Sequence, residues 1–299
     1  VQYNKSGRKT KEAKCVYEDQ RGPIRKAMTN AVEKLDRCFG KKELKVRREE
    51  ITFINMPITF DRYRVLQISD LHSRCFGENQ RDLLQAIRRE VPEMIFLTGD
   101  LIDKEYNEEE KRCIWPLLEE IVRIAPCYAI EGNHEARTDT AAQLFEDMRS
   151  LGITVLLDEG VEVKQANGNK IGIVGLRSDP DGSLKRKKPV SPEKQKIRND
   201  IMKMFDPGEF VILLAHCPEE LDSYLKMGVT LIFSGHAHGG LMKLPFGLRL
   251  LAPGQGIFPR YTHDLIFEQE SVMLVSAGLG GARLGIQPEL VSLVMFEDE

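Results

Sequence analysis

The sequence lacks several features that would place it in particular protein classes. Among its 299 residues, no apolar run approaches the roughly 20 residues that a membrane-spanning helix needs. No secretory apolar segment opens the sequence. The net charge is only -3, which argues against general affinity for nucleic acid. With 41% hydrophobic and 30% charged residues, the composition is instead that of a globular protein with a sizeable core.

The six cysteines also lack a recognisable pattern. They occur at positions 15, 38, 75, 113, 127 and 217, and none forms a CxxC pair. We therefore expect reduced, mostly packed thiols rather than a disulfide framework. This expectation favours a cytoplasmic protein. Because the sequence begins at Val1 without Met, a removed N-terminal signal or anchor stays open as an alternative.

The first 50 residues differ from the rest in charge. They hold 15 Lys+Arg against 8 Asp+Glu, a net charge of +7, so the remaining 249 residues carry -10. Apolar residues between positions 24 and 35 recur at helical spacing, which predicts an amphipathic helix. We interpret residues 1–50 as a basic arm packed on a main domain that spans 51–299. Peripheral association of the arm with an anionic membrane is the alternative.

From residue 50 onward, strand-like and helix-like patterns alternate. Five apolar runs predict buried strands at 65–69, 94–98, 127–131, 210–215 and 229–233. Helical patterns occur at 79–89, 108–124, 140–151, 191–204 and 218–227. Shorter strands are predicted at 51–54, 58–60, 153–157, 161–163, 171–176, 272–276 and 290–296. The alternation predicts an α/β fold with largely parallel sheet, and two sheets packed face to face with outer helices fit the pattern.

Each of the five apolar runs ends in side chains that can bind a metal. In parallel α/β sheets, ligands bind beyond the carboxyl ends of the strands. An Asp at such a place is usually a helix cap, and a lone His is usually packed or solvated. Their joint occurrence after five strands is much harder to explain in that way. We therefore predict that one metal centre gathers seven residues: Asp70, His72, Asp100, Asn133, His216, His236 and His238.

Seven ligands are too many for one tetrahedral zinc ion. We expect one ion on Asp70, His72 and His238, a second on Asn133, His216 and His236, and Asp100 between them. Mixed imidazole and carboxylate ligands suit Mn, Fe or Zn better than Ca or Mg. Two such ions are an arrangement for phosphoryl chemistry, because they lower the pKa of a bridging water and neutralise charge on the phosphate. We expect a bridging hydroxide to attack phosphorus.

Several other polar residues have two interpretations each. His134 follows Asn133 directly, so it is a candidate general acid for the leaving oxygen, or else it holds Asp100 or Asp70. Glu131 and Glu135 either orient His134 or cap the next helix, and we favour the cap. A further set of residues either contacts substrate or faces solvent: Arg74, His263 and Arg283.

These blocks resemble those of a known family. Asp70-x-His72, Gly99-Asp100, Gly132-Asn133-His134-Glu135, His216 and Gly235-His236-Ala237-His238 reproduce, in order, the five blocks of the calcineurin-like metallophosphoesterases. The resemblance covers about residues 60–299. It implies a β-sandwich core flanked by helices, a dinuclear centre, and hydrolysis of phosphoester or pyrophosphate bonds. It also implies the same ligand assignment.

A narrower resemblance concerns segments after the last ligand. The segments 241–247 and 252–256, the glycines near 278–280 and the Pro288-Glu289 pair look like the bacterial branch of YkuE-like phosphohydrolases. That branch is similar to the UDP-2,3-diacylglucosamine hydrolases. The alternative function is therefore a pyrophosphate hydrolase acting on a nucleotide-linked lipid. A non-catalytic scaffold on the same fold is the third hypothesis, and the intact set of site residues argues against it.

Overall fold

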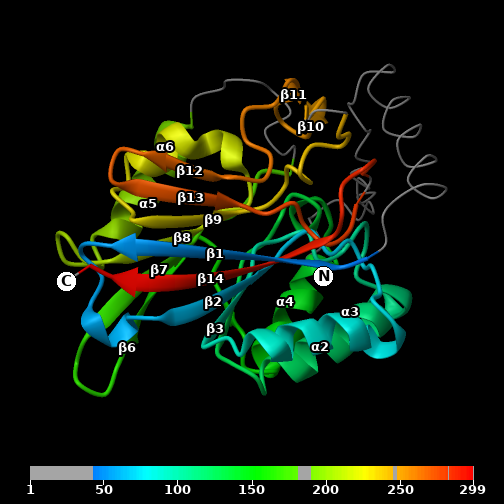
Figure 1. The fold of residues 1–299 in the computed structure, drawn as a ribbon, viewed down its shortest axis with the longest axis horizontal. Coiled ribbons are helices and arrows are strands. Elements are labelled where there is room, and N and C mark those ends of the chain that lie inside the picture. The colour runs from blue at the N-terminus through cyan, green and yellow to red at the C-terminus, as the bar shows by residue number, and fades with distance from the viewer. Residues whose placement is uncertain (1–42, 181–189, 245–247, 282, 299) are drawn as a thin grey trace, which may run out of the picture.

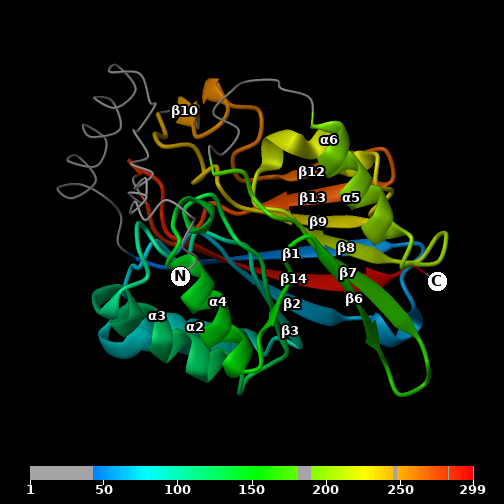
Figure 2. The same ribbon diagram turned by 180° about the vertical axis from the view of Figure 1, so that it is seen from behind.

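Two six-stranded sheets face each other in the computed structural model, which describes residues 43–180, 190–244, 248–281 and 283–298 (Figure 1). Helices cover the outer face of each sheet, so the molecule is a β-sandwich between two helical layers (Figures 1 and 2). This arrangement confirms the predicted α/β fold with two sheets packed face to face.

The first sheet has the strand order β1-β14-β2-β3-β4-β5. Strands β2 to β5 are parallel, and β14 runs antiparallel to β2. The strand bounds are β1 Lys45–Phe53, β2 Tyr63–Ile68, β3 Met94–Leu97, β4 Cys127–Ala129, β5 Thr154–Val155 and β14 Glu289–Glu297. Three helices pack on its outer face: α2 Arg81–Glu90, α3 Glu108–Ile121 and α4 Ala141–Ser150.

The second sheet has the order β12-β13-β9-β8-β7-β6, and its four central strands are parallel. The strand bounds are β6 Glu159–Lys164, β7 Lys170–Gly175, β8 Val211–Leu214, β9 Leu231–Ser234, β12 Leu265–Glu268 and β13 Ser271–Val275. Its outer face carries α5 Pro192–Met202 and α6 Leu221–Leu225 (Figure 2). A small hairpin of β10 Leu251–Ala252 and β11 Gly256–Ile257 lies apart from both sheets.

Aromatic side chains fill the interior between the two sheets. Phe96 of the first sheet meets Phe233 of the second edge to face, with ring centroids 5.0 Å apart. Phe53 and Phe210 form a similar pair at 5.1 Å. All four rings are buried, and such pairs add packing energy to the area that they remove from water. The two sheets are therefore held at a fixed spacing, which matters for a site built from both.

The N-terminal strand and the segment after it differ from our predictions. Strand β1 begins at Lys45, well before residue 51, because it pairs in parallel with β14 along its whole length. Residues 58–60 form a 3-10 turn, η1 Ile58–Phe60, instead of a strand. Pro57 precedes the turn, and its carbonyl accepts the N–H of Phe60 at 2.8 Å. The helix predicted near 24–35 lies outside the described residues.

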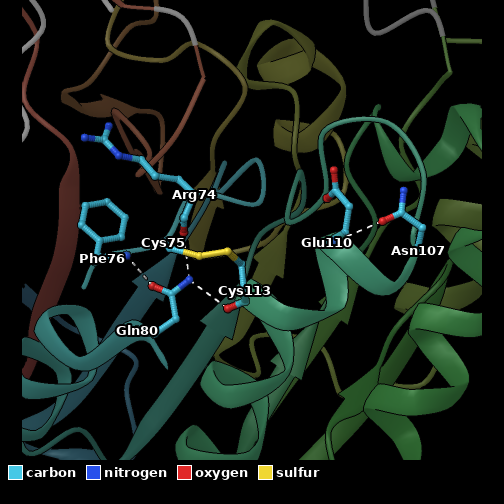
Figure 3. Close-up of a disulfide and its surroundings, with 7 residues drawn as sticks. All are labelled: Arg74, Cys75, Phe76, Gln80, Asn107, Glu110 and Cys113. Atoms are coloured by element: carbon cyan, nitrogen blue, oxygen red, sulfur yellow. Dashed lines mark hydrogen bonds between the residues drawn. A yellow bond between two sulfur atoms is a disulfide. The ribbon is translucent and has the colours of Figure 1, made fainter. Parts of the chain in front are cut away.

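The expectation that every cysteine is a free thiol is wrong for one pair. Cys75 and Cys113 form a disulfide with a Cα–Cα distance of 5.5 Å (Figure 3). The two cysteines are 38 positions apart in the sequence with no pairing signal, and only the packing of α3 beside the loop after β2 brings them together. Gln80 bridges the same two segments, because its amide donates to the carbonyl oxygens of Arg74 and Cys113 (Figure 3). Cys127 and Cys217 are free and buried, as expected.

None of the helices within the described ranges is long and apolar enough to cross a bilayer.

Candidate metal centre

The carboxyl ends of five strands meet at one edge of the sandwich. Strands β2, β3 and β4 come from the first sheet, and β8 and β9 come from the second. The structure brings all seven predicted ligands together here, and their side chains are almost fully buried. Six of the seven form two groups on either side of Asp100. The Asp70 group comprises Asp70, His72 and His238, and the Asn133 group comprises Asn133, His216 and His236.

The Asp70 group can hold one cation. One ligand atom from each of its three residues lies within 4.8 Å of the others. Nε2 of His238 is 3.7 Å from Oδ1 of Asp70, and the rings of His72 and His238 stack with centroids 5.0 Å apart. The group joins the two sheets, because Asp70 and His72 follow β2 whereas His238 follows β9.

The Asn133 group lies on the other side of Asp100. Asp100, His216 and His236 also offer three ligand atoms within 4.8 Å of one another. One end of the Asn133 amide is 2.6 Å from Nδ1 of His236 and 3.3 Å from Nε2 of His216. Its other end is 3.1 Å from both terminal nitrogens of Arg137. A cation between the rings requires the amide oxygen to face them, and that orientation takes the oxygen away from Arg137.

Asp100 lies between the two groups. Its Oδ2 is 3.2 Å from Nε2 of His216 and 3.8 Å from Nε2 of His72. Its Oδ1 accepts the backbone N–H of His134 at 2.8 Å. A single carboxylate oxygen that faces a histidine of each group has the position that a shared ligand needs.

The backbone is strained at several of the predicted ligands. Five of the seven predicted ligands have positive φ angles between 46° and 63°: Asp70, His72, Asp100, His236 and His238. Residues with a Cβ rarely adopt this region, and such strain gathers at functional sites. The backbone is held by hydrogen bonds between the loops, such as Asp70 N–H to the carbonyl of Gly99 at 3.0 Å.

Glu135 fixes the loop that carries Asp100. Its buried carboxylate accepts the backbone N–H groups of Asp100, Leu101, Ile102 and Gly132 at 2.7–3.1 Å. Our expectation that Glu135 caps the next helix is therefore wrong. Glu135 instead links the loops after β3 and β4 through these hydrogen bonds. Local helix-capping patterns in the sequence do not predict such a contact between loops.

The histidine tautomers suit a cation. The carbonyl of Thr98 can only accept, so Nδ1 of His216 donates to it at 2.7 Å and Nε2 is left to face Asp100. Two acceptors then point at each other, and a proton or a metal must lie between them. Burial opposes a proton there, but Asp100 raises the pKa of His216 to about 10. A cation can replace this proton, and metal ligation requires the neutral ring.

The pKa values of the other predicted ligands also favour metal binding. Burial raises the pKa of the Asp70 carboxyl. Burial also disfavours the charged form of Asp100, but His216, His134 and His72 outweigh it and hold the pKa of Asp100 well below its usual range. Burial lowers the pKa values of His236 and His238, so both rings are neutral and able to bind a metal. Nε2 of His72 and Nε2 of His236 are buried without a hydrogen-bond partner in the described chain. The donor set fits metal cations.

His134 lies at the rim of the centre. Its side chain is 26% exposed, and its Nε2 is 4.0 Å from Oδ2 of Asp100. Nδ1 faces the backbone oxygen of Asp103, which fixes the ring with Nε2 toward the centre. Its ring packs edge to face against His72 at 4.6 Å. His134 is thus close to the ligands yet partly open to solvent.

The other polar candidates lie outside the ligand cluster. Arg283 is fully buried and donates to the carbonyls of Ala277 and Gly278, so it does not face solvent. His263 pairs with Asp264 and Glu289. Arg74 donates to the carbonyl of Leu279. Three further residues border the centre that were not among the sequence predictions, although each lies close to a ligand block in the sequence: Asp103, Arg137 and Glu219.

Comparison with known proteins agrees with this geometry. Residues 63–240, more than half of the chain, match the family model described as calcineurin-like phosphoesterase. The metallophosphoesterase YkuE of Bacillus subtilis (strain 168) is 27% identical over 240 residues, which cover 78% of this chain and 77% of YkuE. Phosphodiesterase YaeI of Escherichia coli (strain K12) is 26% identical over 240 residues, covering 77% of this chain and 81% of YaeI.

Similar solved structures include TT1561 of Thermus thermophilus and the NAD nucleotidase NadN of Haemophilus influenzae. TT1561 is 11% identical with a TM-score of 0.45, and the match covers 73% of this chain and 91% of the TT1561 chain. NadN is 16% identical with a TM-score of 0.43, covering 72% of this chain and 50% of its own. From the family match and its relatives, this chain belongs to the calcineurin-like phosphoesterase family and is a metal-dependent phosphoric ester hydrolase.

Proposed function

We propose that this chain hydrolyses phosphoester bonds with two metal ions, one held by the Asp70 group and one by the Asn133 group, with Asp100 shared. The observation that carries the proposal is the position of Oδ2 of Asp100 between His216 and His72. Bound ions of this kind acidify water and neutralise the charge on a phosphate. Mn, Fe and Zn all suit the imidazole and carboxylate ligands.

The chain's own residues account for the rest of the reaction. His134 supplies the proton for the departing oxygen, because its Nε2 points to the centre and its ring is partly open to solvent. When the side-chain oxygen of Asn133 faces an ion, it no longer accepts a hydrogen bond from Arg137. The Arg137 guanidinium can then bind a phosphate oxygen. Glu135 keeps Asp100 in place throughout.

A phosphodiester is the substrate class that we favour. The support is the relative from Escherichia coli that is named a phosphodiesterase. In a diester, a monoester and a pyrophosphate alike, the bond that is cleaved is a phosphorus–oxygen bond. The same residues would therefore act on a monoester or a pyrophosphate.

The test is manganese-dependent hydrolysis of p-nitrophenyl phosphate and bis-p-nitrophenyl phosphate by the wild type, Asp100→Ala and His134→Ala. We expect turnover by the wild type, a faster rate on the diester, and a very large loss of rate in Asp100→Ala. Asp222→Asn is the matched control, because Asp222 is an exposed carboxylate on α6 outside the centre. A wild type that binds no metal, or an Asp100→Ala variant that keeps full activity, would refute the proposal.

A further inference from the structure

Glu219 is a buried acidic residue with no role in the scheme above. It lies in the turn η4 Pro218–Glu220, three residues after His216. Its side chain is only 12% exposed. Neither carboxylate oxygen has a hydrogen-bond partner among the described residues. A buried carboxylate without a partner costs free energy, so its presence calls for an explanation.

The carboxylate of Glu219 faces one atom that also has no partner. Oε1 of Glu219 is 3.7 Å from Nε2 of His236, and this ring nitrogen is buried without a hydrogen bond in the described chain. The other ring nitrogen, Nδ1, faces Asn133 within the metal centre. The ring of His236 therefore has an inner nitrogen for the metal and an outer nitrogen toward Glu219.

The other histidines of the centre show what the outer nitrogen normally does. Nδ1 of His216 donates to the carbonyl of Thr98 at 2.7 Å, and Nδ1 of His238 lies 3.3 Å from the carbonyl of Gly280. Such partners fix the tautomer of a metal-binding histidine and the direction of its lone pair. For His236, the described chain offers the Glu219 carboxylate in place of a carbonyl.

We propose that Glu219 is a positioning residue that accepts the Nε2–H of His236 and so directs Nδ1 toward the ion of the Asn133 group. This inference rests on the proposed metal centre. A separation of 3.7 Å exceeds an ordinary N–H···O bond, so the proposed bond requires the Glu219 side chain to move closer to the ring.

Charge balance gives a second reason for this assignment. The Asp70 group contains an anionic ligand of its own, whereas Asn133, His216 and His236 are all neutral when they bind a metal. Apart from the shared Asp100, the ion of the Asn133 group therefore has no anionic ligand. Glu219 is the acidic side chain directly behind His236, and a carboxyl group that accepts the ring N–H of a ligand strengthens that ring as a ligand.

A third ion held by Cys217, Glu219 and His236 is the competing explanation. One ligand atom from each of these residues lies within 4.8 Å of the others. That ion needs a lone pair on Nε2 of His236, while Nδ1 already serves the Asn133 group. His236 then has to lose both ring protons, which an ordinary neutral imidazole does not do. The hydrogen bond needs no such loss, so we favour it.

The test measures manganese binding by calorimetry and elemental analysis in the wild type, Glu219→Ala, Glu219→Gln and the control Asp222→Asn. We expect Glu219→Ala to keep one ion at wild-type affinity and to weaken the second by about 10- to 100-fold. Glu219→Gln should fall between, because its amide oxygen still accepts from Nε2–H. Asp222→Asn should match the wild type.

The outcomes separate this inference from the proposed function. A wild type that binds fewer than two ions contradicts the metal centre itself. Two ions in the wild type with unchanged affinities in both Glu219 variants overturn only the role of Glu219. Three ions in the wild type, with one lost in both Glu219→Ala and Cys217→Ser, overturn it in favour of the third site. Thermal unfolding of the metal-free variants shows whether they fold, and the conservative Glu219→Gln still tests the inference if the alanine variant does not.

Discussion

The two sheets contribute different chemistry to the same centre. The first sheet supplies both carboxylates, the amide and one imidazole, through Asp70 and His72 after β2, Asp100 after β3 and Asn133 after β4. The second sheet supplies only imidazoles, through His216 after β8 and the pair His236 and His238 after β9. In the proposed assignment, each ion takes ligands from both sheets. The proposed two-ion centre therefore requires the two sheets to pack together.

The two halves also differ in how they are braced. On the first sheet, Glu135 collects four backbone N–H groups, and the Cys75–Cys113 disulfide ties the loop after His72 to α3. On the second sheet, backbone carbonyls and Glu219 orient the rings. Charged ligands need a rigid frame because they repel each other, whereas neutral rings need a fixed tautomer. The following predictions test this division.

The largest effect is expected for Asp100→Ala, which removes the one ligand shared by both groups. We expect hydrolysis to fall by on the order of 10³-fold or more, since both ions lose a ligand and their spacing. His238→Ala removes a ligand from the Asp70 group alone and should retain the other ion. The measurement is steady-state hydrolysis together with the metal content of each purified variant. Equal retention of metal by both variants would contradict the shared position of Asp100.

His134→Ala should lower the rate by about 10²- to 10³-fold while both ions stay bound, because His134 acts on the leaving group and is not a ligand. The check is the rate on two aryl diesters with good and poor leaving groups. A proton donor matters most for the poor leaving group. A uniform loss on both substrates, or a loss of metal, would assign His134 to holding the ligands instead.

Removal of metal should loosen the contact between the two sheets. In the proposed centre each ion binds residues of both sheets, so a bound ion would stabilise the folded state by linkage, by about 2.7 kcal/mol for an ion at one hundred times its Kd. We expect the thermal midpoint to fall by several degrees after chelation and to recover on addition of Mn²⁺. Asp100→Ala is the control, and its midpoint should respond much less. A midpoint in the wild type that ignores metal would contradict the sheet-bridging role.

Reduction of the disulfide should affect the first sheet without removing the ions. A native disulfide usually contributes about 2–4 kcal/mol. Denaturant unfolding with and without a thiol reductant should show a loss of this size in the wild type. The double variant Cys75→Ser/Cys113→Ser is the control, since its stability should not depend on the reductant. The same stability in oxidised and reduced wild type would show that the bond contributes nothing.

The smallest effect concerns Glu131, beside the ligand loop after β4. Burial raises the pKa of Glu131 to about 7, although Arg177 lies 3.5 Å away. The folded state then holds a proton that the unfolded state releases near pH 4.5, so stability falls between about pH 4.5 and 7. Glu131→Gln should reduce this fall by about 1–2 kcal/mol. Denaturant unfolding at pH 5 and pH 8 measures it, and identical pH slopes in both proteins would be the contrary result.

Much of the fold and most of the candidate site could be predicted from the sequence, because they depend on local patterns of apolar and polar residues. Apolar runs that end in Asp, Asn or His gave five strands and the ligands after them. The parts that depend on distant contacts could not be predicted. The disulfide needs α3 to pack beside the loop after β2, and the brace of Glu135 needs the loops after β3 and β4 to meet. Lys45 joins a strand only because β14, near the end of the chain, lies beside it.

The most direct test is a titration of the metal-free protein with Mn²⁺ that follows bound metal and hydrolysis of bis-p-nitrophenyl phosphate together. The two-ion centre predicts that activity rises steeply only as the second ion binds and saturates at two ions per chain. Full activity at one ion per chain, or activity that does not depend on metal, would contradict the proposed two-ion centre.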